Sequence, residues 1–159
     1  MVGPLSSKEQ LARVVDFLGA GEGTPLAGGK ALDTADGGYY VPPTVFSDVP
    51  PDGRLAREEI FGPVVALLEV DSYEEAVASA NDTPYGLSAT VFTKDLDRAL
   101  DFANEIRAGV VKINQESAGV ELHVPFGGMK ASSCGPREQG KAAREFFTQS
   151  KTVYVGKSE

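Results

Sequence analysis

Apolar residues near the start of the chain recur with the period of an α-helix. They are Leu11, Val14, Val15 and Leu18, at positions i, i+3, i+4 and i+7. Ser6 or Ser7 precedes this run as a candidate N-cap, and Gly19 or Gly21 can end it. The pattern therefore predicts a helix over residues 8–18 that buries one face.

From residue 64 onward, short apolar runs alternate with segments of helical period. The pattern predicts strands over 64–70, 87–92 and 109–113, with helices over 72–80 and 96–107 between them. Helices that connect successive strands imply right-handed crossovers and a largely parallel sheet, so the predicted fold class is α/β. A helix over 137–147 and a β-type tail over 151–155 follow.

Two stretches before residue 64 are less regular. The glycine-rich stretch 19–38 predicts a short strand between loops, and it lacks the glycine pattern of a phosphate-binding loop. Residues 39–46 are aromatic and β-branched, but Pro42 and Pro43 interrupt them. Because proline cannot donate to a β-ladder, we predict an edge strand or an extended segment here rather than a central strand.

Two adjacent carboxylates precede the strand predicted over 64–70. Glu58 and Glu59 lead into Gly62-Pro63, a pair that cannot continue a helix. The acids are therefore predicted to lie on a bend at the mouth of a buried strand, where α/β proteins hold ligands. This bend is the first candidate site.

Composition narrows the class of function. A chain of 159 residues, 42% hydrophobic and 24% charged, is sized for one globular domain. Its formal net charge of −8 opposes binding to nucleic acid or to an anionic membrane, which require clustered Lys and Arg. One cysteine, Cys134, and one histidine, His123, exclude an intrachain disulfide and a Cys- or His-rich metal site. No leader pattern and no apolar run of roughly 20 residues are present, so we expect a cytoplasmic protein with no membrane partner.

Six motifs occur in order along the chain: Gly3-Pro4-Leu5, Glu58 to Val64, Asn81 to Leu87, Pro125 to Lys130, Arg137 to Gly140 and Lys151 to Val153. With these motifs the chain resembles the C-terminal part of NAD(P)-dependent aldehyde dehydrogenases from residue 3 to about residue 155. Residues 130–138 are similar to the branch that oxidises α-ketoglutarate semialdehyde. The resemblance implies a truncated catalytic domain over 1–147 and an oligomerisation strand and tail over 148–159.

The resemblance also assigns roles to individual residues. It implies that Glu59 binds the nicotinamide ribose, that Phe61 is an apolar wall beside the nicotinamide, that Phe126 lines the aldehyde pocket and that Glu138 relays protons. Each has a structural alternative. Glu59 is otherwise a solvated acid, Phe61 and Phe126 are otherwise core residues, and Glu138 is otherwise an acid in the first turn of a helix.

In the family, the nucleophilic cysteine, the general base and the dinucleotide-binding domain lie upstream of the point where this chain begins. We therefore expect no catalytic residue in this chain apart from a relay role for Glu138. NAD or NADP is expected to bind the full-length parent, and neither is expected to bind this chain alone. Cys134 lies far downstream of the family nucleophile and is expected to be a bystander, as is His123. Asn114 either orients a loop near the pocket or forms a turn.

The tail from residue 148 to 155 resembles the strand that these enzymes pair across a subunit boundary. The expected partners are therefore a second copy of the chain, in a homodimer or a higher oligomer, and a small aldehyde in the parent enzyme. Two rival interpretations stay open at this point. One is a non-catalytic assembly or regulatory module, and the other is an independent thiol enzyme that uses Cys134.

Overall fold

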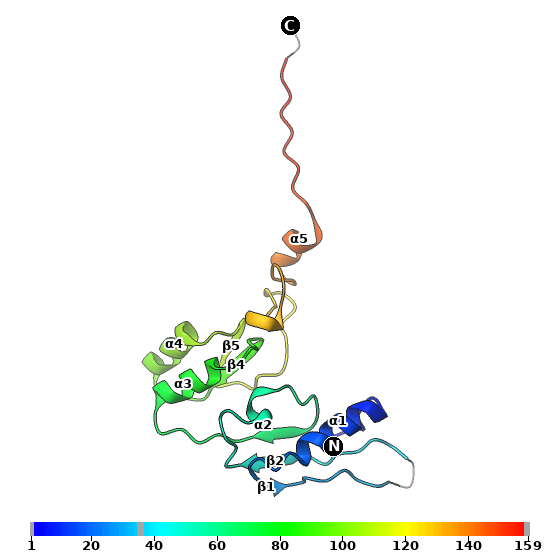
Figure 1. The fold of residues 1–159 in the computed structure, drawn as a ribbon. Coiled ribbons are helices and arrows are strands. Elements are labelled where there is room, and N and C mark those ends of the chain that lie inside the picture. Colours follow the sequence, from blue (N-terminus) through cyan, green and yellow to red (C-terminus); the bar gives the residue numbers. More distant parts are fainter. Residues whose placement is uncertain (1, 35–36, 158–159) are drawn as a thin grey trace. The chain divides into compact units, whose positions relative to one another are not determined.

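The computed structural model describes residues 2–34 and 37–157. Residues 35–36 of the glycine-rich stretch and 158–159 of the predicted tail lie outside the described residues. The chain forms two compact units, Met1–Ala76 and Val77–Glu159, and each is described here by itself. Figure 1 labels their elements.

The first unit contains helix α1 (Lys8–Leu18) and a three-stranded sheet. The helix has the predicted limits, and its N-cap Ser7 accepts a hydrogen bond from the Gln10 N–H at 3.2 Å. The strands β1 (Thr24–Ala27), β2 (Thr44–Ser47) and β3 (Val64–Ala66) lie in that order. The pair β1–β2 is antiparallel and β2–β3 is parallel.

The prediction that residues 39–46 form an edge strand or an extended segment rather than a central strand is wrong for residues 44–46, because they belong to β2, the central strand of the sheet. The strand begins at Thr44, directly after Pro42 and Pro43, so neither proline interrupts the ladder. The Thr44 N–H donates to the Pro63 carbonyl at 2.8 Å. Prolines that precede a strand leave its hydrogen bonding intact.

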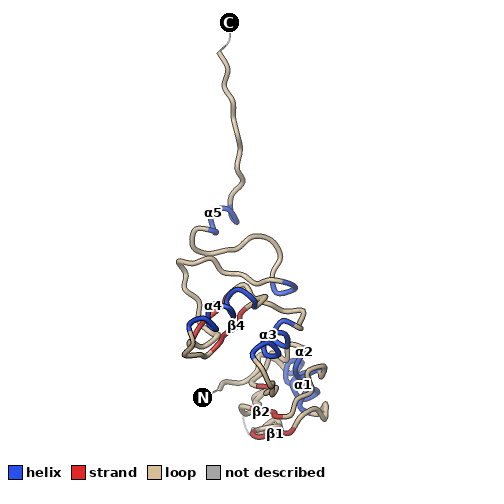
Figure 2. Tube along the Cα trace, turned by 90° about the vertical axis from the view of Figure 1, so that its left-hand side faces the viewer, coloured by secondary structure: helices blue, strands red, loops and turns tan. Residues whose placement is uncertain are grey.

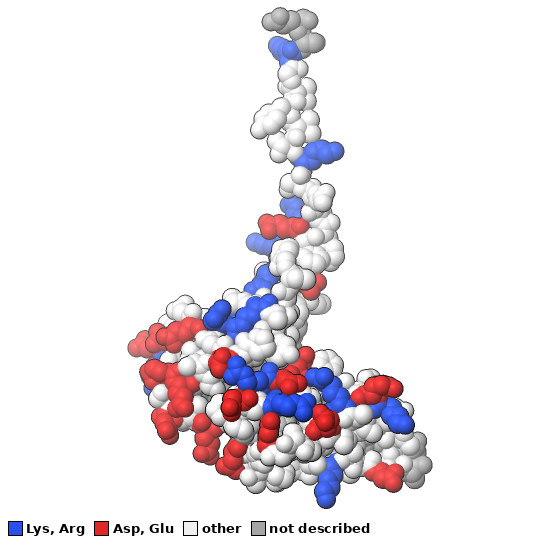
Figure 3. All heavy atoms as spheres, viewed as in Figure 1, with Lys and Arg blue, Asp and Glu red and all other residues white. Residues whose placement is uncertain are grey.

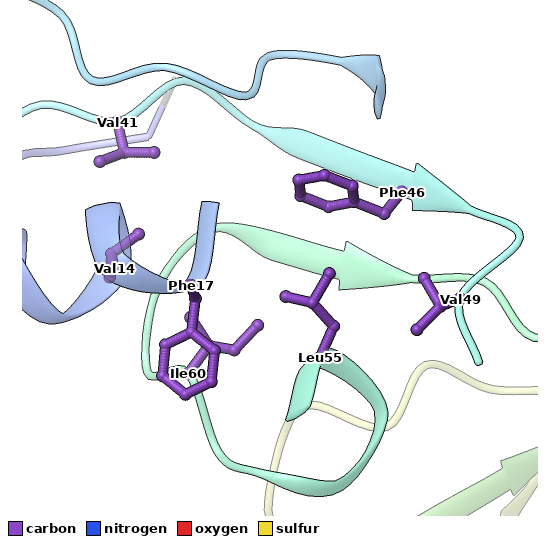
Figure 4. Close-up of a cluster of buried hydrophobic side chains, with 7 residues drawn as sticks. All are labelled: Val14, Phe17, Val41, Phe46, Val49, Leu55 and Ile60. Carbon is purple, nitrogen blue, oxygen red and sulfur yellow. The ribbon is translucent and has the colours of Figure 1, made fainter. Parts of the chain in front are cut away.

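One apolar cluster holds the first unit together. Figure 4 shows Val14 and Phe17 from α1 gathered with Phe46 from β2 and Leu55 from the short helix α2 (Arg54–Arg57). Val14 is 0% exposed, and burying each side chain of this kind contributes roughly 1.5–3 kcal/mol. Of the apolar face predicted for α1, Val14 enters the core and Leu11 and Leu18 pack against it, whereas Val15 is 43% exposed. Phe17, outside the predicted set, is the other buried residue of the helix.

A β-α-β unit organises the second part of the chain. Helix α3 (Tyr73–Asn81) precedes β4 (Ser88–Val91), and α4 (Leu96–Glu105) connects β4 to the parallel strand β5 (Val110–Ile113). Asp95 caps α4 by accepting hydrogen bonds from the N–H groups of Asp97 and Arg98. The α/β class and the parallel pairing are confirmed, although β3 and β4 belong to different sheets.

The end of the chain is less helical than predicted. Helix α5 covers Ala142–Phe147, so the prediction of a helix from 137 is wrong. Gln139 and Gly140 have φ values of 68° and 51°, in the left-handed region, which a right-handed helix cannot contain. A single 3₁₀ turn, η1 (Lys130–Ser132), lies before them. Residues 148–157 carry no helix or strand (Figure 2).

Figure 3 shows acidic side chains gathered at the lower left of the drawn face, whereas basic side chains lie mainly toward its middle, beside further acidic ones. None of the helices in the described part of the chain combines the length and the apolar character that crossing a bilayer requires.

Candidate functional site

The bend that carries Glu59 and Phe61 is held from the side by helix α1. The Arg13 guanidinium donates to the Glu59 carbonyl at 2.7 Å, through Nη2. The Gln10 side-chain amide donates to the carbonyls of Ile60, at 3.1 Å, and Phe61, at 2.8 Å. Three successive carbonyls of the bend are therefore fixed by two side chains one turn apart on α1.

This bend is strained, and its surroundings compensate for the strain. Phe61 has φ 60°, a left-handed conformation that costs a bulky residue roughly 1–2 kcal/mol. The buried side chain of Ile60 anchors the bend in the core. A Cβ atom on Gly62 would lie 2.7 Å from Cγ2 of Val14, so the glycine lets α1 pack directly against the bend.

The two acids of the bend have different surroundings. The Glu58 carboxylate pairs with Arg54 at 3.1 Å, and Arg54 also pairs with Asp16 at 3.1 Å. The hydrogen bond to Asp16, and then the one to Glu58, raises the pKa of the Arg54 guanidinium. Glu59 is exposed, and no group in the described part of the chain donates a hydrogen bond to its carboxylate. Glu59 therefore keeps its acceptor capacity for a ligand.

Phe61 is not a core residue in this structure, because its ring is 73% exposed. Phe61 does not continue an extended chain from Glu59, since its φ is 60°. The left-handed residue breaks the two-residue alternation of a strand. Both side chains are nevertheless presented to solvent by the same short bend.

In the second unit, Phe126 and Glu138 form an isolated antiparallel bridge. The Phe126 N–H donates to the Glu138 carbonyl at 2.6 Å, and the Glu138 N–H donates to the Phe126 carbonyl at 3.0 Å. The alternative that Glu138 is an acid in the first turn of a helix is wrong, because it lies in this bridge ahead of α5. Its side chain is exposed.

Phe126 is half-buried and lines a hollow of about 440 Å³. The other walls are β5 and the loop that follows it, with residues from Gln115 to Glu121 contributing. A hollow of this size suits a small organic ligand. The partial exposure of the ring fits a pocket wall better than a fully packed core position.

The segment after Phe126 packs closely on its neighbours. A Cβ atom on Gly109 would lie 1.8 Å from the Gly127 carbonyl oxygen, so only glycine fits there. The Gly128 N–H donates to the Ser133 hydroxyl at 2.7 Å, and the Gly86 N–H donates to the Ser132 hydroxyl at 2.9 Å. These contacts explain why glycine and serine dominate a segment that forms only one turn of regular structure.

Asn114 forms the turn at the end of β5. Its φ is 55°, a conformation that asparagine tolerates better than most residues. Its side-chain amide accepts from the Thr93 N–H and donates to the Thr93 carbonyl, both at 2.8 Å. Of the two roles expected from the sequence, turn formation is the one that the structure shows.

The sequence profile of the aldehyde dehydrogenase family matches residues 1–153. The chain belongs to the aldehyde dehydrogenase family. It is 52% identical to the α-ketoglutaric semialdehyde dehydrogenase of Bacillus subtilis, over 97% of this chain and 33% of that protein. It is 46% identical to the α-ketoglutarate semialdehyde dehydrogenase of Haloferax volcanii, over 96% of this chain and 33% of that protein. The chain thus spans about a third of the length of these relatives.

Solved aldehyde dehydrogenases have the same fold. The indole-3-acetaldehyde dehydrogenase of P. syringae, in complex with NAD+ and IAA, matches with a TM-score of 0.91 and 41% identity over 97% of this chain and 31% of that chain. The Mycobacterium tuberculosis aldehyde dehydrogenase complexed with NAD+ matches with a TM-score of 0.89 and 38% identity over 98% of this chain and 32% of that chain. The predicted family and fold class are therefore confirmed.

Three other polar residues of this aldehyde dehydrogenase segment are either exposed on the surface or hydrogen-bonded to the backbone of a neighbouring segment. Cys134 is exposed, and His123 is an exposed side chain 3.7 Å from the Glu121 carboxylate. Lys130 donates to the carbonyls of Asn81, at 2.9 Å, and Thr83, at 3.1 Å, and so ties its loop to the end of α3.

Sequence reasoning missed the two residues that hold the Glu59 bend. Gln10 and Arg13 lie on the polar side of α1, where periodicity predicts only solvated side chains. Their carbonyl partners lie 46 to 51 residues later in the chain. Their spacing of one helical turn is the only local signal, and it is too common to identify such a contact.

Proposed function

We propose that the bend carrying Glu59 and Phe61 forms part of the nicotinamide coenzyme site of a full-length aldehyde dehydrogenase. The observation that carries this proposal is the exposed Glu59 carboxylate on a bend whose backbone Arg13 and Gln10 hold. A carboxylate is acceptor-only and can take hydrogen bonds from two vicinal ribose hydroxyls. The exposed Phe61 ring supplies an apolar surface for the nicotinamide. Solved relatives complexed with NAD+ support the coenzyme class.

The proposed reaction is the oxidation of an aldehyde to a carboxylic acid with NAD(P) as hydride acceptor. Phe126 lines the aldehyde pocket in this proposal, supported by its place in the hollow beside β5. Glu138 is proposed as a proton relay, and its exposed side chain leaves it accessible to water. The 52% identity to an α-ketoglutaric semialdehyde dehydrogenase favours a semialdehyde as substrate.

This chain alone is proposed to be inactive. A cysteine nucleophile needs an adjacent base or cation to activate it, whereas Cys134 is exposed and no described group forms a hydrogen bond with its thiol. We therefore assign Cys134 no catalytic role. Aldehyde-dependent reduction of NAD by the isolated chain, lost in Cys134→Ser, would contradict this assignment.

Self-association through the tail is the proposed mode of assembly, as in a homodimer or a higher oligomer. Val153, Tyr154 and Val155 are 69%, 93% and 91% exposed, and they form an apolar extended segment that can add to a sheet edge. The same observation favours the second candidate, a non-catalytic assembly module. Sedimentation of the full chain and of a chain ending at residue 147 tests the assembly, since a monomer in both cases would contradict it.

The coenzyme proposal is tested by Glu59→Gln in the full-length protein that carries this chain. A hydrogen bond to a charged group contributes about 1.5–3 kcal/mol, so coenzyme affinity or the hydride-transfer rate should fall by about 10- to 100-fold. Glu58→Gln is the matched control, because the Glu58 carboxylate pairs with Arg54 within the protein. Unchanged coenzyme binding and hydride transfer in Glu59→Gln would refute the ribose role.

A further inference from the structure

The loop between β5 and Phe126 is fixed at both ends. At its start, the Asn114 N–H donates to the Val91 carbonyl at 2.8 Å, and the Asn114 amide is bonded to Thr93. At its end, Phe126 exchanges two backbone hydrogen bonds with Glu138. These anchors hold the entry and the exit of the loop but not its middle.

The middle of the loop is held by Lys112, on β5. The Lys112 ammonium donates to the carbonyls of Ala118 and Gly119, the latter at 2.9 Å. Among the described residues, these are the hydrogen bonds that reach residues 115–120. Gly119 has φ 85°, a left-handed conformation that glycine adopts without steric cost.

Lys112 also lines the hollow in which Phe126 lies. Its side chain is half-buried, and both β5 and the loop that it holds contribute residues to the lining of the hollow. The position of Ala118 and Gly119 therefore helps to determine how wide the hollow of about 440 Å³ is. Two of the three N–H donors of the Lys112 ammonium bind backbone carbonyls of the loop, which leaves one donor for any other partner.

We propose that Lys112 is a positioning residue for substrate selection. By holding Ala118 and Gly119, it sets the width of the hollow beside Phe126 and thereby selects aldehydes by the size of the group distal to the carbonyl. The inference rests on the proposed function, in which Phe126 lines the aldehyde pocket.

The kinetic test compares Lys112→Met with Lys112→Arg in the full-length protein. Methionine keeps an unbranched stem but cannot donate, whereas arginine can still donate to carbonyls. With two aldehydes that differ by several carbons in the distal group, Lys112→Met should reduce the ratio of their kcat/KM values about tenfold. The KM for the coenzyme should stay constant, and Lys112→Arg should retain most of the discrimination.

The ratio separates positioning from simple destabilisation. Loss of folded enzyme lowers kcat/KM for both aldehydes equally and leaves their ratio unchanged. An unchanged ratio in Lys112→Met would overturn the proposal. The variant Phe126→Ala tests the underlying assignment, because an unchanged ratio there would remove Phe126 from the aldehyde pocket whatever Lys112 does.

A second measurement does not depend on activity. In the 159-residue chain, ¹⁵N relaxation should show lower order parameters for residues 115–120 in Lys112→Met than in the wild type. Residues 93–95 should be unchanged, since Asn114 holds Thr93 independently. Unchanged order parameters over 115–120 would show that Lys112 does not hold the loop and would overturn the proposal.

Discussion

The Arg13 guanidinium holds the backbone of Glu59 and leaves its carboxylate available. The bond runs from Nη2 to the Glu59 carbonyl oxygen over 2.7 Å, and the Arg13 guanidinium also lies 5.2 Å from the centre of the Phe17 ring. A cation over an aromatic face is attracted to it, so Arg13 is itself restrained. The candidate coenzyme residue is thus positioned through its main chain by a helix that starts 51 residues earlier.

Removal of the Gln10 amide should loosen the bend. Gln10→Ala loses the donors to Ile60 and Phe61 and should lower the free energy of unfolding of the first unit by about 1 kcal/mol. Urea titration followed by the NMR signals of residues 2–76 measures this. Lys8→Ala, at an exposed position of the same helix, is the control and should change little. Equal effects in the two variants would contradict the role of Gln10.

Gly62→Ala should destabilise the contact between α1 and the bend. The added Cβ would lie 2.7 Å from Cγ2 of the fully buried Val14, and overpacking of this kind costs about 1–3 kcal/mol. Gly3→Ala is the control, because nothing lies within 4 Å of a Cβ there. The double variant with Val14→Ala should show a coupling between the two sites. Strictly additive effects would indicate that the clash is not relieved at Val14.

Glu22 should make the free energy of unfolding decrease as the pH falls into the acid range. Its carboxylate accepts from the Leu55 N–H at 2.9 Å and so satisfies the start of α2. The backbone hydrogen bonds from Leu55 and then Arg54 lower the pKa of Glu22. A group with a lowered folded-state pKa stabilises the protein above its unfolded pKa, and this contribution is lost as pH falls through the lowered folded pKa.

Glu22→Gln should therefore be less stable than the wild type at pH 7 and should approach it in acid. Urea midpoints measured from neutral pH to below the lowered pKa of Glu22 test this behaviour. The exposed Glu69 supplies the matched control Glu69→Gln. A difference between Glu22→Gln and wild type that stays constant over the whole range would argue against the capping role.

Two substitutions of Asn114 separate the stability contributed by its side-chain hydrogen bonds from the cost of its left-handed backbone. Asn114→Gly loses the amide bonds to Thr93, at a cost of about 1 kcal/mol, but accepts φ 55° freely. Asn114→Ala loses the same bonds and adds roughly 1–2 kcal/mol for the left-handed conformation. Asn114→Ala should therefore be less stable than Asn114→Gly. Urea unfolding of the second unit measures the difference. The reverse order would show that the left-handed conformation does not limit this position.

Local signals predicted some elements well. The helix over 8–18 has its predicted limits because both the cap at Ser7 and the apolar period are properties of neighbouring residues. The helix expected from 137 begins at Ala142 instead, since Glu138 is paired with Phe126 and the next two residues, Gln139 and Gly140, are left-handed. That bridge joins segments whose pairing has no local signature.

For the candidate site, the sequence indicated the residues but not the hydrogen bonds and packing contacts that hold them in place. The residue pattern indicated the bend at Glu59, and resemblance to the family assigned the roles of Glu59, Phe61, Phe126 and Glu138. Solvent exposure of Phe61 and the hydrogen-bond partners of Phe126 could not be predicted, because exposure depends on the segments that pack nearby.

The sequence by itself determined the aldehyde dehydrogenase family, the α/β class and the helix over 8–18, because these depend on ordered motifs and on periods within short segments. Tertiary structure alone decided that β2 is a central strand and that Gln10 and Arg13 hold the Glu59 bend. Both features join residues far apart in the chain. Such contacts exist only after folding has brought their donors and acceptors within about 3 Å of each other.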